Sequence, residues 1–277
     1  MLFIMLKKYN TMTKIYEKVA ENFLELASLQ RLNILFKLLE RNRKRIEPLA
    51  KELDATKQEV HRNLLRLEQS GLITKDKESK YGLTTFGRTM CAEIPSILFL
   101  SQYEDYFSDH DFGDIPVKFV MRAGQLATGS HIKGITKTLE KWKSVYKNAN
   151  EYIYEILSEI PADLFDPLIK KIKSGIKYQY IVSESAIVPE GRITTLKKTG
   201  FYELMENGLI ERKMKKSVRV VIILNEKEAC VSFPKSNGEA DLTEMFYSDN
   251  DMFREWCLDY FRYCWYGSDI FQESKLK

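Results

Sequence analysis

The chain has 277 residues, with 43 Lys and Arg against 39 Asp and Glu, and a formal net charge of +4. This length predicts two domains rather than one. Charge is unevenly spread, because residues 1–90 hold 18 basic against 11 acidic side chains, whereas the remainder holds 25 against 28. We therefore expect the basic amino-terminal part to bind nucleic acid and the remainder of the chain to bind something else.

Cysteine, histidine and hydropathy patterns exclude several classes of protein. The four cysteines show no CxxC spacing and the chain has only three histidines, so we expect neither a zinc site nor a cofactor, and we expect buried thiols in a reducing cytoplasm. The apolar run in MLFIMLKKYN is too short for a membrane span and has no cleavage-site pattern. We expect a cytoplasmic protein that does not enter membranes.

Residues 15–27 and 29–39 predict two amphipathic helices, which complete a three-helix core with the segment that follows. In residues 45–84 the apolar spacing predicts a short helix from Ile46 to Leu53. Thr56 is the expected N-cap of a second helix, with Glu59 three residues later as its capping-box partner. Gly71 suits the end of that helix, and a hairpin with a turn at residues 76–79 follows. The order predicts a winged helix-turn-helix, which presents one helix to the major groove of DNA.

The side chains opposite the buried stripe of the second helix suit DNA recognition. Arg62 can form a bidentate hydrogen bond to guanine and Gln58 can pair with adenine, while Lys57 at the helix start favours phosphate. The predicted DNA-binding set also includes basic residues before the motif and in the hairpin, and neighbours on the same helix: His61, Arg66, Arg43, Lys44, Arg45, Lys75, Lys77 and Lys80. The alternative is a solvated charged helix without a DNA role.

After the hairpin, Thr84 or Thr85 is expected to cap a helix that runs toward Ile94, with a break or kink at Pro95. Residues 96–116 mix aromatic and acidic side chains and predict a helical connector, which could pair with its counterpart in a second chain. The predicted organisation is a winged-helix DNA-binding domain at 12–95, the connector at 96–116 and an α/β domain for effector sensing and dimerisation at 117–277.

The carboxy-terminal part alternates strand-like and helix-like segments. Strands are predicted at 152–158, 176–183, 208–214, 218–225 and 229–234, and helices at 161–175 and 191–206. This alternation predicts an α/β fold with a parallel or mixed sheet. In residues 251–268, aromatic and sulfur side chains repeat at helical spacing. They favour a helix packed on the sheet or at a dimer interface over an aromatic ligand box.

Catalytic patterns are weak. His131 and Lys133 have the HxK spacing of phospholipase D-type phosphodiesterases, but Thr138 stands where that motif needs Asp, and no second copy exists. The sequence therefore predicts no catalytic residues, and we expect the protein not to be an enzyme.

An effector site is expected where parallel strands end. Ser183 and Glu184 follow one strand, and Arg192 begins the next helix, so these three side chains could bind a polar or anionic ligand through the fork of Arg192. An ordinary polar loop is the alternative. Arg212, with Lys213, Lys215 and Lys216, is interpreted as part of a solvated hairpin rather than a phosphate site.

Two parts of the chain resemble known archaeal regulators. GLITKDKESKYGLTTFGR resembles the wing and following helix of ArsR-like winged-helix regulators. ANEYIYEIL, IKYQYIV, VVIILNEKEACVSFP and the segment GEADLTEMFYSDNDMFREWCLDYFRYCWYGS are similar to the sensor domain of methanogenesis (filament-formation) regulators. The resemblance implies a transcription regulator with an effector-sensing domain.

The sequence hypothesis is a homodimeric regulator that binds specific double-stranded DNA sites and is controlled by a small-molecule effector or a partner at its α/β domain. One alternative is an adaptor that docks the transcription machinery. The other is a phospholipase D-like phosphodiesterase that uses His131.

Overall fold

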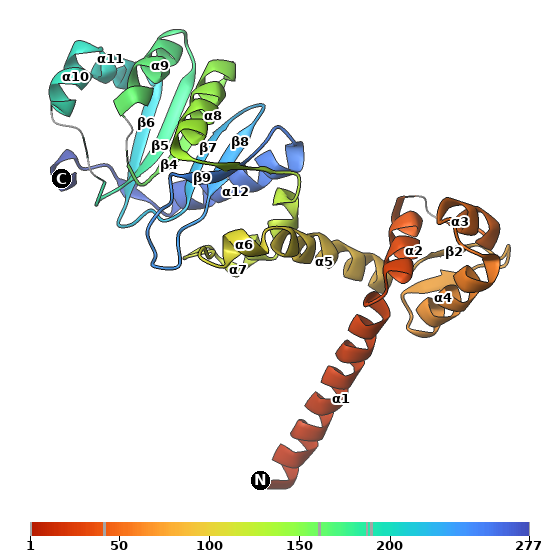
Figure 1. Cartoon of the computed structure of the whole chain (residues 1–277). Helices are drawn as coiled ribbons and strands as arrows, with labels where there is room; N and C mark the ends of the chain where they lie inside the picture. The colour runs from red at the N-terminus through yellow and green to blue at the C-terminus, as the bar shows by residue number, and fades with distance from the viewer. Residues whose placement is uncertain (1, 41–42, 160–161, 187, 189–190, 277) are drawn as a thin grey trace. The chain divides into compact units, whose positions relative to one another are not determined.

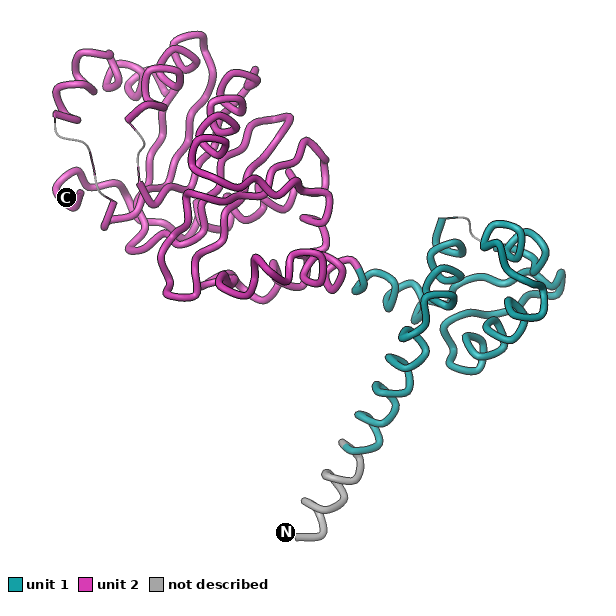
Figure 2. The backbone as a smooth tube through the Cα atoms, viewed as in Figure 1, with its two compact units in different colours: residues 1–94 teal, residues 95–277 magenta. Residues whose placement is uncertain are grey.

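The computed structural model describes residues 2–40, 43–159, 162–186, 188 and 191–276. It divides the chain into two compact units, residues 1–94 (unit 1) and 95–277 (unit 2), which are coloured separately in Figure 2. Within the described part, none of the helices combines the length and apolar character that a bilayer crossing requires.

Unit 1 is a helical domain with a small hairpin (Figure 1). Its elements are α1 (Leu2–Leu26), α2 (Leu29–Glu40), α3 (Ile46–Glu52), α4 (Lys57–Gln69), β1 (Ile73–Lys75), β2 (Tyr81–Leu83) and the first part of α5 (Thr85–Gln102). The strands pair antiparallel with Ile73 opposite Leu83, and Lys44 forms an additional bridge to Tyr81. Helices α2, α3 and α4 bury a common core that includes Leu35, Leu49 and Leu64. This is the predicted winged helix-turn-helix.

Local signals in the sequence begin and end the elements of unit 1. The hydroxyl of Thr56 accepts a hydrogen bond from the backbone N–H of Glu59 at 3.2 Å, and the Glu59 carboxylate accepts one from the Thr56 N–H at 3.0 Å. The predicted capping box is therefore confirmed. Gly71, just beyond α4, has a φ of 75°, which favours glycine. The Thr84 hydroxyl accepts from the Gly87 N–H at 3.0 Å and so caps α5.

Of the break or kink predicted at Pro95, the break is wrong. Helix α5 runs from Thr85 to Gln102 with Pro95 inside it. Proline removes one N–H donor, but Cys91 before it and Phe99 after it are both buried, each in the core of its own unit. We attribute the continuous helix to this packing on either side.

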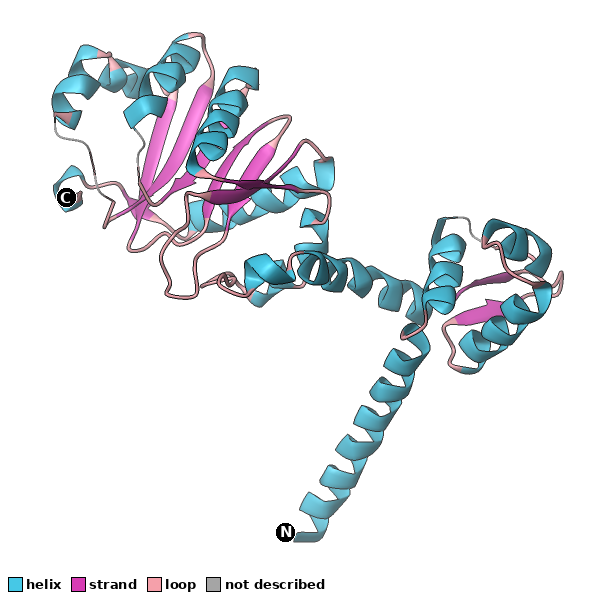
Figure 3. Ribbon diagram, viewed as in Figure 1, coloured by secondary structure: helices cyan, strands magenta, loops and turns pink. Residues whose placement is uncertain are grey.

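Unit 2 is built on one mixed sheet, drawn in magenta in Figure 3. The sheet has eight strands in the order β10-β6-β5-β4-β7-β8-β9-β3. Strands β4, β5 and β6 are parallel, and the other pairings are antiparallel. The strands are β3 (Ser130–Lys133), β4 (Tyr152–Leu157), β5 (Lys177–Ser183), β6 (Ile210–Lys215), β7 (Val221–Asn225), β8 (Ala229–Ser232), β9 (Glu244–Ser248) and β10 (Asp269–Ile270). The expected α/β fold with a mixed sheet is confirmed.

Helices cover both faces of this sheet. Those of unit 2 are the end of α5, α6 (Glu104–Phe107), α7 (Val117–Val120), η1 (Ala123–Leu126), α8 (Ile135–Asn148), α9 (Ala162–Lys173), α10 (Arg192–Lys198), α11 (Phe201–Glu206), α12 (Asp251–Tyr266) and η2 (Glu273–Lys275). One core cluster joins α8, α9, α10 and α11 to the sheet, and the other joins α12 and residues 99–126 to its opposite face. The predicted connector therefore contributes Phe99, Tyr106 and Ile115 to the core of unit 2.

Several predicted elements of unit 2 need correction. The single helix expected at 191–206 is two helices, because Gly200 between them has a φ of 75° and ends the first. The strand expected from residue 218 begins at Val221. The sequence did not indicate β3, β9 or α8. The aromatic helix is confirmed as a core element, with Phe253, Trp256 and Phe261 fully buried.

Candidate nucleic-acid interface and effector site

The outward face of α4 carries polar side chains that are free of the core. Gln58, His61 and Arg62 are exposed, whereas Val60, Leu64 and Leu67 are buried beneath them. Arg62 forms no ion pair with any residue that the structure describes. A capped helix with an unpaired guanidinium and an amide on its open face has the donors and acceptors that base edges require.

A hollow of about 470 Å³ lies beside the start of α4. Its lining comes from α3, α4 and the hairpin turn, and includes Arg45, Lys57, Gln58 and His61. Lys57 Nζ lies 2.8 Å from Glu47 Oε1, and this contact lowers the pKa of the Glu47 carboxyl. The fold thus brings four of the predicted DNA-binding residues to one concave surface.

The hairpin holds its basic residues beside a structured turn. Asp76 accepts hydrogen bonds from the backbone N–H groups of Glu78 and Lys80, both at 2.9 Å, and these bonds lower the pKa of Asp76. Lys80 Nζ pairs with Glu78 at 2.6 Å, and Arg43 pairs with Asp76 at 3.3 Å. Lys75 lies 5.5 Å from the centre of the Tyr81 ring.

At the tip of this turn, Lys77 is exposed and has no ion pair within the described part of the chain. Its charge is therefore open to solvent and to an incoming phosphate.

Two members of the predicted interface are neutralised inside unit 1. Lys44 is buried and its Nζ pairs with Glu52. The Arg66 guanidinium makes two hydrogen bonds to Glu25 of α1, at 2.7 and 3.1 Å, which lower the pKa of the Glu25 carboxyl. We therefore remove Lys44, which is buried, and Arg66, whose guanidinium is held by two bonds to one carboxylate, from the candidate interface. Arg43, Lys57 and Lys80 stay in it, because each makes a single ion pair at the surface, and such pairs are weak.

The HxK segment forms the edge strand β3. His131 Nε2 lies 2.8 Å from Glu244 Oε2, and Lys133 Nζ lies 3.9 Å from the same oxygen. The His131 ring also stacks on Phe246 at 4.9 Å. Thr138 is buried and its hydroxyl donates to the backbone oxygen of Thr243 at 3.2 Å. The pair is thus held against β9.

Of the three predicted effector residues, one reaches a cavity. Arg192 lines a cavity of about 270 Å³ between α9, β5, α10 and α11. Ser183 is buried and its hydroxyl interacts with that of Ser185 at 2.8 Å. Glu184 pairs with Lys275 at 2.5 Å. Neither Ser183 nor Glu184 lines the cavity.

The structure adds two residues to Arg192 that the sequence interpretation missed. One carboxylate oxygen of Glu273 forms an ion pair with Arg192, and the other forms an ion pair with Arg212 at 3.0 Å. The sequence interpretation placed Arg212 in a solvated hairpin, and for this residue it is therefore wrong. Glu273 lies 81 residues from Arg192 and 61 from Arg212, so no local spacing could have indicated the cluster.

The four cysteines are free and buried, as expected. Burial raises the pKa of the Cys91 and Cys264 thiols. Among the described residues, no group of three or more His, Cys, Asp or Glu side chains is arranged to hold a metal ion.

Together, these features define a two-unit protein with a winged helix-turn-helix and a mixed α/β unit. Residues 21–100 match the family described as the HVO_A0261 N-terminal domain. No curated protein matches the chain.

The solved structures that are similar to this chain include the following three, each at 13% sequence identity. One is TrmBL2, an archaeal chromatin protein described as showing a novel mode of DNA binding, with a TM-score of 0.41 over 88% of this chain and 94% of that one. Nuc, a phospholipase D family member from Salmonella typhimurium, and NucT from Helicobacter pylori each give a TM-score of 0.39. Both matches cover 52% of this chain, together with 99% of Nuc and 98% of NucT. At these scores the likenesses say nothing of what this chain binds.

Proposed function

We propose that this protein is a sequence-specific, DNA-binding transcription regulator whose activity is controlled at unit 2. The observation that carries this proposal is the open face of α4, where Gln58, His61 and Arg62 are exposed beside a hairpin with Lys77 at its tip. In winged-helix proteins this helix enters the major groove. Arg62 would read guanine, and Lys77 would contact phosphate.

The two roles are separated by comparing bound DNA sequences. Duplexes enriched from a random pool by the wild-type protein would be titrated by fluorescence anisotropy, with a random duplex alongside. Arg62→Ala should weaken binding to the enriched duplex by about 1–3 kcal/mol and relax base preference. Lys77→Ala should weaken both duplexes similarly and reduce the salt slope by about one.

Lys14→Ala on α1 is the matched control, because it removes an exposed cation far along the sequence from the interface. Equal losses on both duplexes for Arg62→Ala would contradict the assigned reading role. Failure to enrich any sequence would contradict specific recognition itself.

We also propose that the regulator is a homodimer joined through α1. Tyr16, Val19 and Phe23 are spaced by three and four residues, and their exposed fractions are 64, 43 and 52%. The sequence continues this spacing downstream to Leu26 and upstream to Met12 and Tyr9. Such a repeat is typical of a two-helix seam, and a second copy of the chain offers an identical stripe.

The mass in solution tests the dimer. Light scattering on the wild-type chain should give twice the chain mass of 32.5 kDa, whereas Val19→Glu combined with Phe23→Glu should give one chain mass. Glu21→Ala, an exposed α1 residue outside this stripe, should leave the dimer intact. A wild-type monomer, or a dimer that survives the double substitution, would contradict pairing through α1.

For unit 2 we propose sensing rather than catalysis. In support of this, the carboxylate of Glu244 lies 2.8 Å from His131 Nε2 and 3.9 Å from Lys133 Nζ, and Thr138 stands where the HxK motif needs an acid. Incubation of the wild-type protein with labelled DNA or RNA and a chelator should leave the polymer intact. Hydrolysis that His131→Ala abolishes would overturn the proposal.

A further inference from the structure

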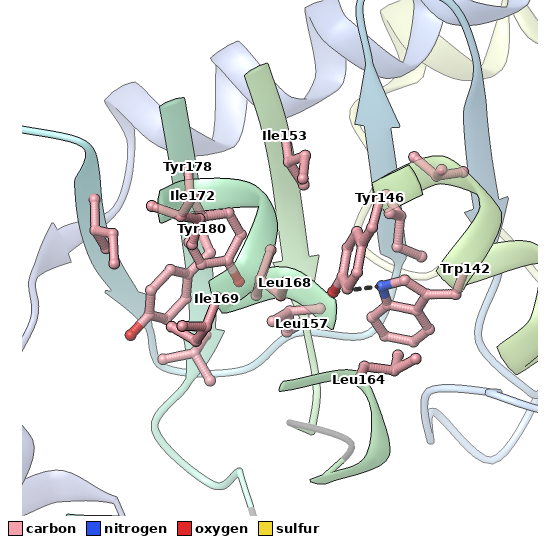
Figure 4. Close-up of a cluster of buried hydrophobic side chains, with 14 of the residues drawn as sticks. Trp142, Tyr146, Ile153, Leu157, Leu164, Leu168, Ile169, Ile172, Tyr178 and Tyr180 are labelled. Atoms are coloured by element: carbon pink, nitrogen blue, oxygen red, sulfur yellow. Dashed lines mark hydrogen bonds between the residues drawn. The ribbon is translucent and has the colours of Figure 1, made fainter. Parts of the chain in front are cut away.

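The cavity at Arg192 has walls suited to a small apolar body. Aromatic and aliphatic side chains from four elements line it: Phe165 and Leu168 of α9, Tyr178 and Tyr180 of β5, Leu196 of α10 and Phe201 of α11. Figure 4 shows Leu168 of α9 beside the two tyrosine rings of β5. Its volume of about 270 Å³ equals that of about nine water molecules in the liquid, which is below the usual size of a pocket for a drug-sized ligand.

Positive charge exceeds negative charge at the polar side of this cavity. The Arg192 and Arg212 side chains are only 10 and 12% exposed, and both use the single carboxylate of Glu273. Arg212 gains a further contact with the Phe271 ring, 3.8 Å from its centre. Asp166 also lines the cavity, but it is solvent-exposed, so its charge is screened. Among the residues that the structure describes, two guanidiniums held out of water against one carboxylate leave one positive charge uncompensated.

We propose that this cavity binds a small organic monocarboxylate with an aromatic or branched apolar body, an inference that rests on the proposed control of unit 2 and names the class of its ligand. The carboxylate takes the Arg192 fork, because a planar guanidinium matches two carboxylate oxygens. The apolar body lies between Phe165, Tyr178 and Phe201. An amine of the same shape would face the charge of Arg192 and is excluded.

Glu273 acts as the built-in competitor for this ligand. Strand β10 pairs with β6, with Ile270 opposite Lys213, and this pairing brings η2 and its first residue, Glu273, beside the two arginines. The Lys275–Glu184 ion pair holds the other end of η2. A bound carboxylate must share or displace Glu273, so the ligand affinity depends on how firmly that side chain is held.

Calorimetry on the full chain tests the ligand class directly, with phenylacetate as the probe and phenethylamine as its cationic counterpart. Wild-type protein should bind phenylacetate in preference to phenethylamine. Arg192→Gln should weaken the binding of phenylacetate by about tenfold or more, because one charge-assisted contact is lost. Glu273→Gln should strengthen the binding of phenylacetate several-fold. Lys197→Gln, an exposed cation on the same helix, should change affinity less than twofold.

The proposal is overturned if phenethylamine binds as well as phenylacetate, if folded wild-type protein binds neither, or if Glu273→Gln leaves the phenylacetate affinity unchanged or weaker. The Glu273 variant keeps the test decisive should Arg192→Gln fail to fold. Anisotropy with enriched DNA, run in parallel, separates the two proposals. Phenylacetate binding without any change in DNA affinity would contradict control of DNA binding and still support the ligand class.

Discussion

Glu155→Gln is the perturbation that most directly tests the interior of unit 2. Glu155 lies on the central strand β4 with no exposed surface. Its carboxylate accepts hydrogen bonds from Trp142 Nε1, the Tyr146 hydroxyl and the Tyr178 hydroxyl, each at 2.6 Å. Burial raises the pKa of Glu155 to about 7, although these three hydrogen bonds act in the opposite direction. Tyr178 also lines the ligand cavity.

The sign of the pH effect follows from this raised pKa. Between pH 4.5, the ordinary pKa of this carboxyl, and about pH 7, the unfolded chain releases the Glu155 proton while the folded protein keeps it. The free energy of unfolding therefore falls as pH rises through this window and levels off above it. At 1.36 kcal/mol for each pH unit, the total loss is about 3 kcal/mol. Glutamine keeps an acceptor for these donors but cannot ionise, so Glu155→Gln should remove this loss.

Urea unfolding followed by tryptophan fluorescence isolates the effect, because all three tryptophans lie in unit 2. The difference in unfolding free energy between variant and wild type should increase by about 3 kcal/mol in favour of the variant between pH 4.5 and pH 8. Other ionisable groups are common to both proteins and cancel. A difference that stays constant with pH, or that moves in favour of the wild type, would refute the reasoning.

Two further predictions concern unit 1. Thr56→Ala removes the capping box of α4 and should cost about 1 kcal/mol, seen as faster hydrogen exchange in residues 57–69; exchange unchanged from wild type would show that the cap contributes little. Gly87→Ala places a Cβ only 1.9 Å from the backbone oxygen of Leu72, so α5 must move. Unit 1 should then lose several kcal/mol of stability, on the scale of overpacked cores. A variant that melts at the same temperature as the wild-type protein would disprove the contact.

The winged helix could be predicted because its determinants are close together in the chain. Thr56 and Glu59 are three residues apart, Gly71 lies two residues beyond the last residue of the helix, and Asp76 closes its own turn. Each of these side chains bonds a backbone group within a few residues, so the pattern survives without knowledge of the rest of the fold.

Edge strands and neutralised charges could not be predicted in this way. Strand β3 exists because His131 pairs with Phe246, more than a hundred residues away, and its own four residues alternate too weakly to indicate a strand. Lys44 and Arg66 had the composition of phosphate contacts, yet Glu52 and Glu25 neutralise them. A charged residue in a sequence does not reveal its partner when that partner comes from another element.

By itself, the sequence determined the class of each unit and the open face of α4, because helical and strand periodicity record which side chains are buried. It also indicated Arg192. Only the tertiary structure decided which cations are free, that Arg192 and Arg212 share the carboxylate of Glu273, and that aromatic and aliphatic side chains from four elements form the cavity at Arg192. Burial and charge pairing depend on distances between segments remote in the chain, and those distances exist only once the sheet has formed.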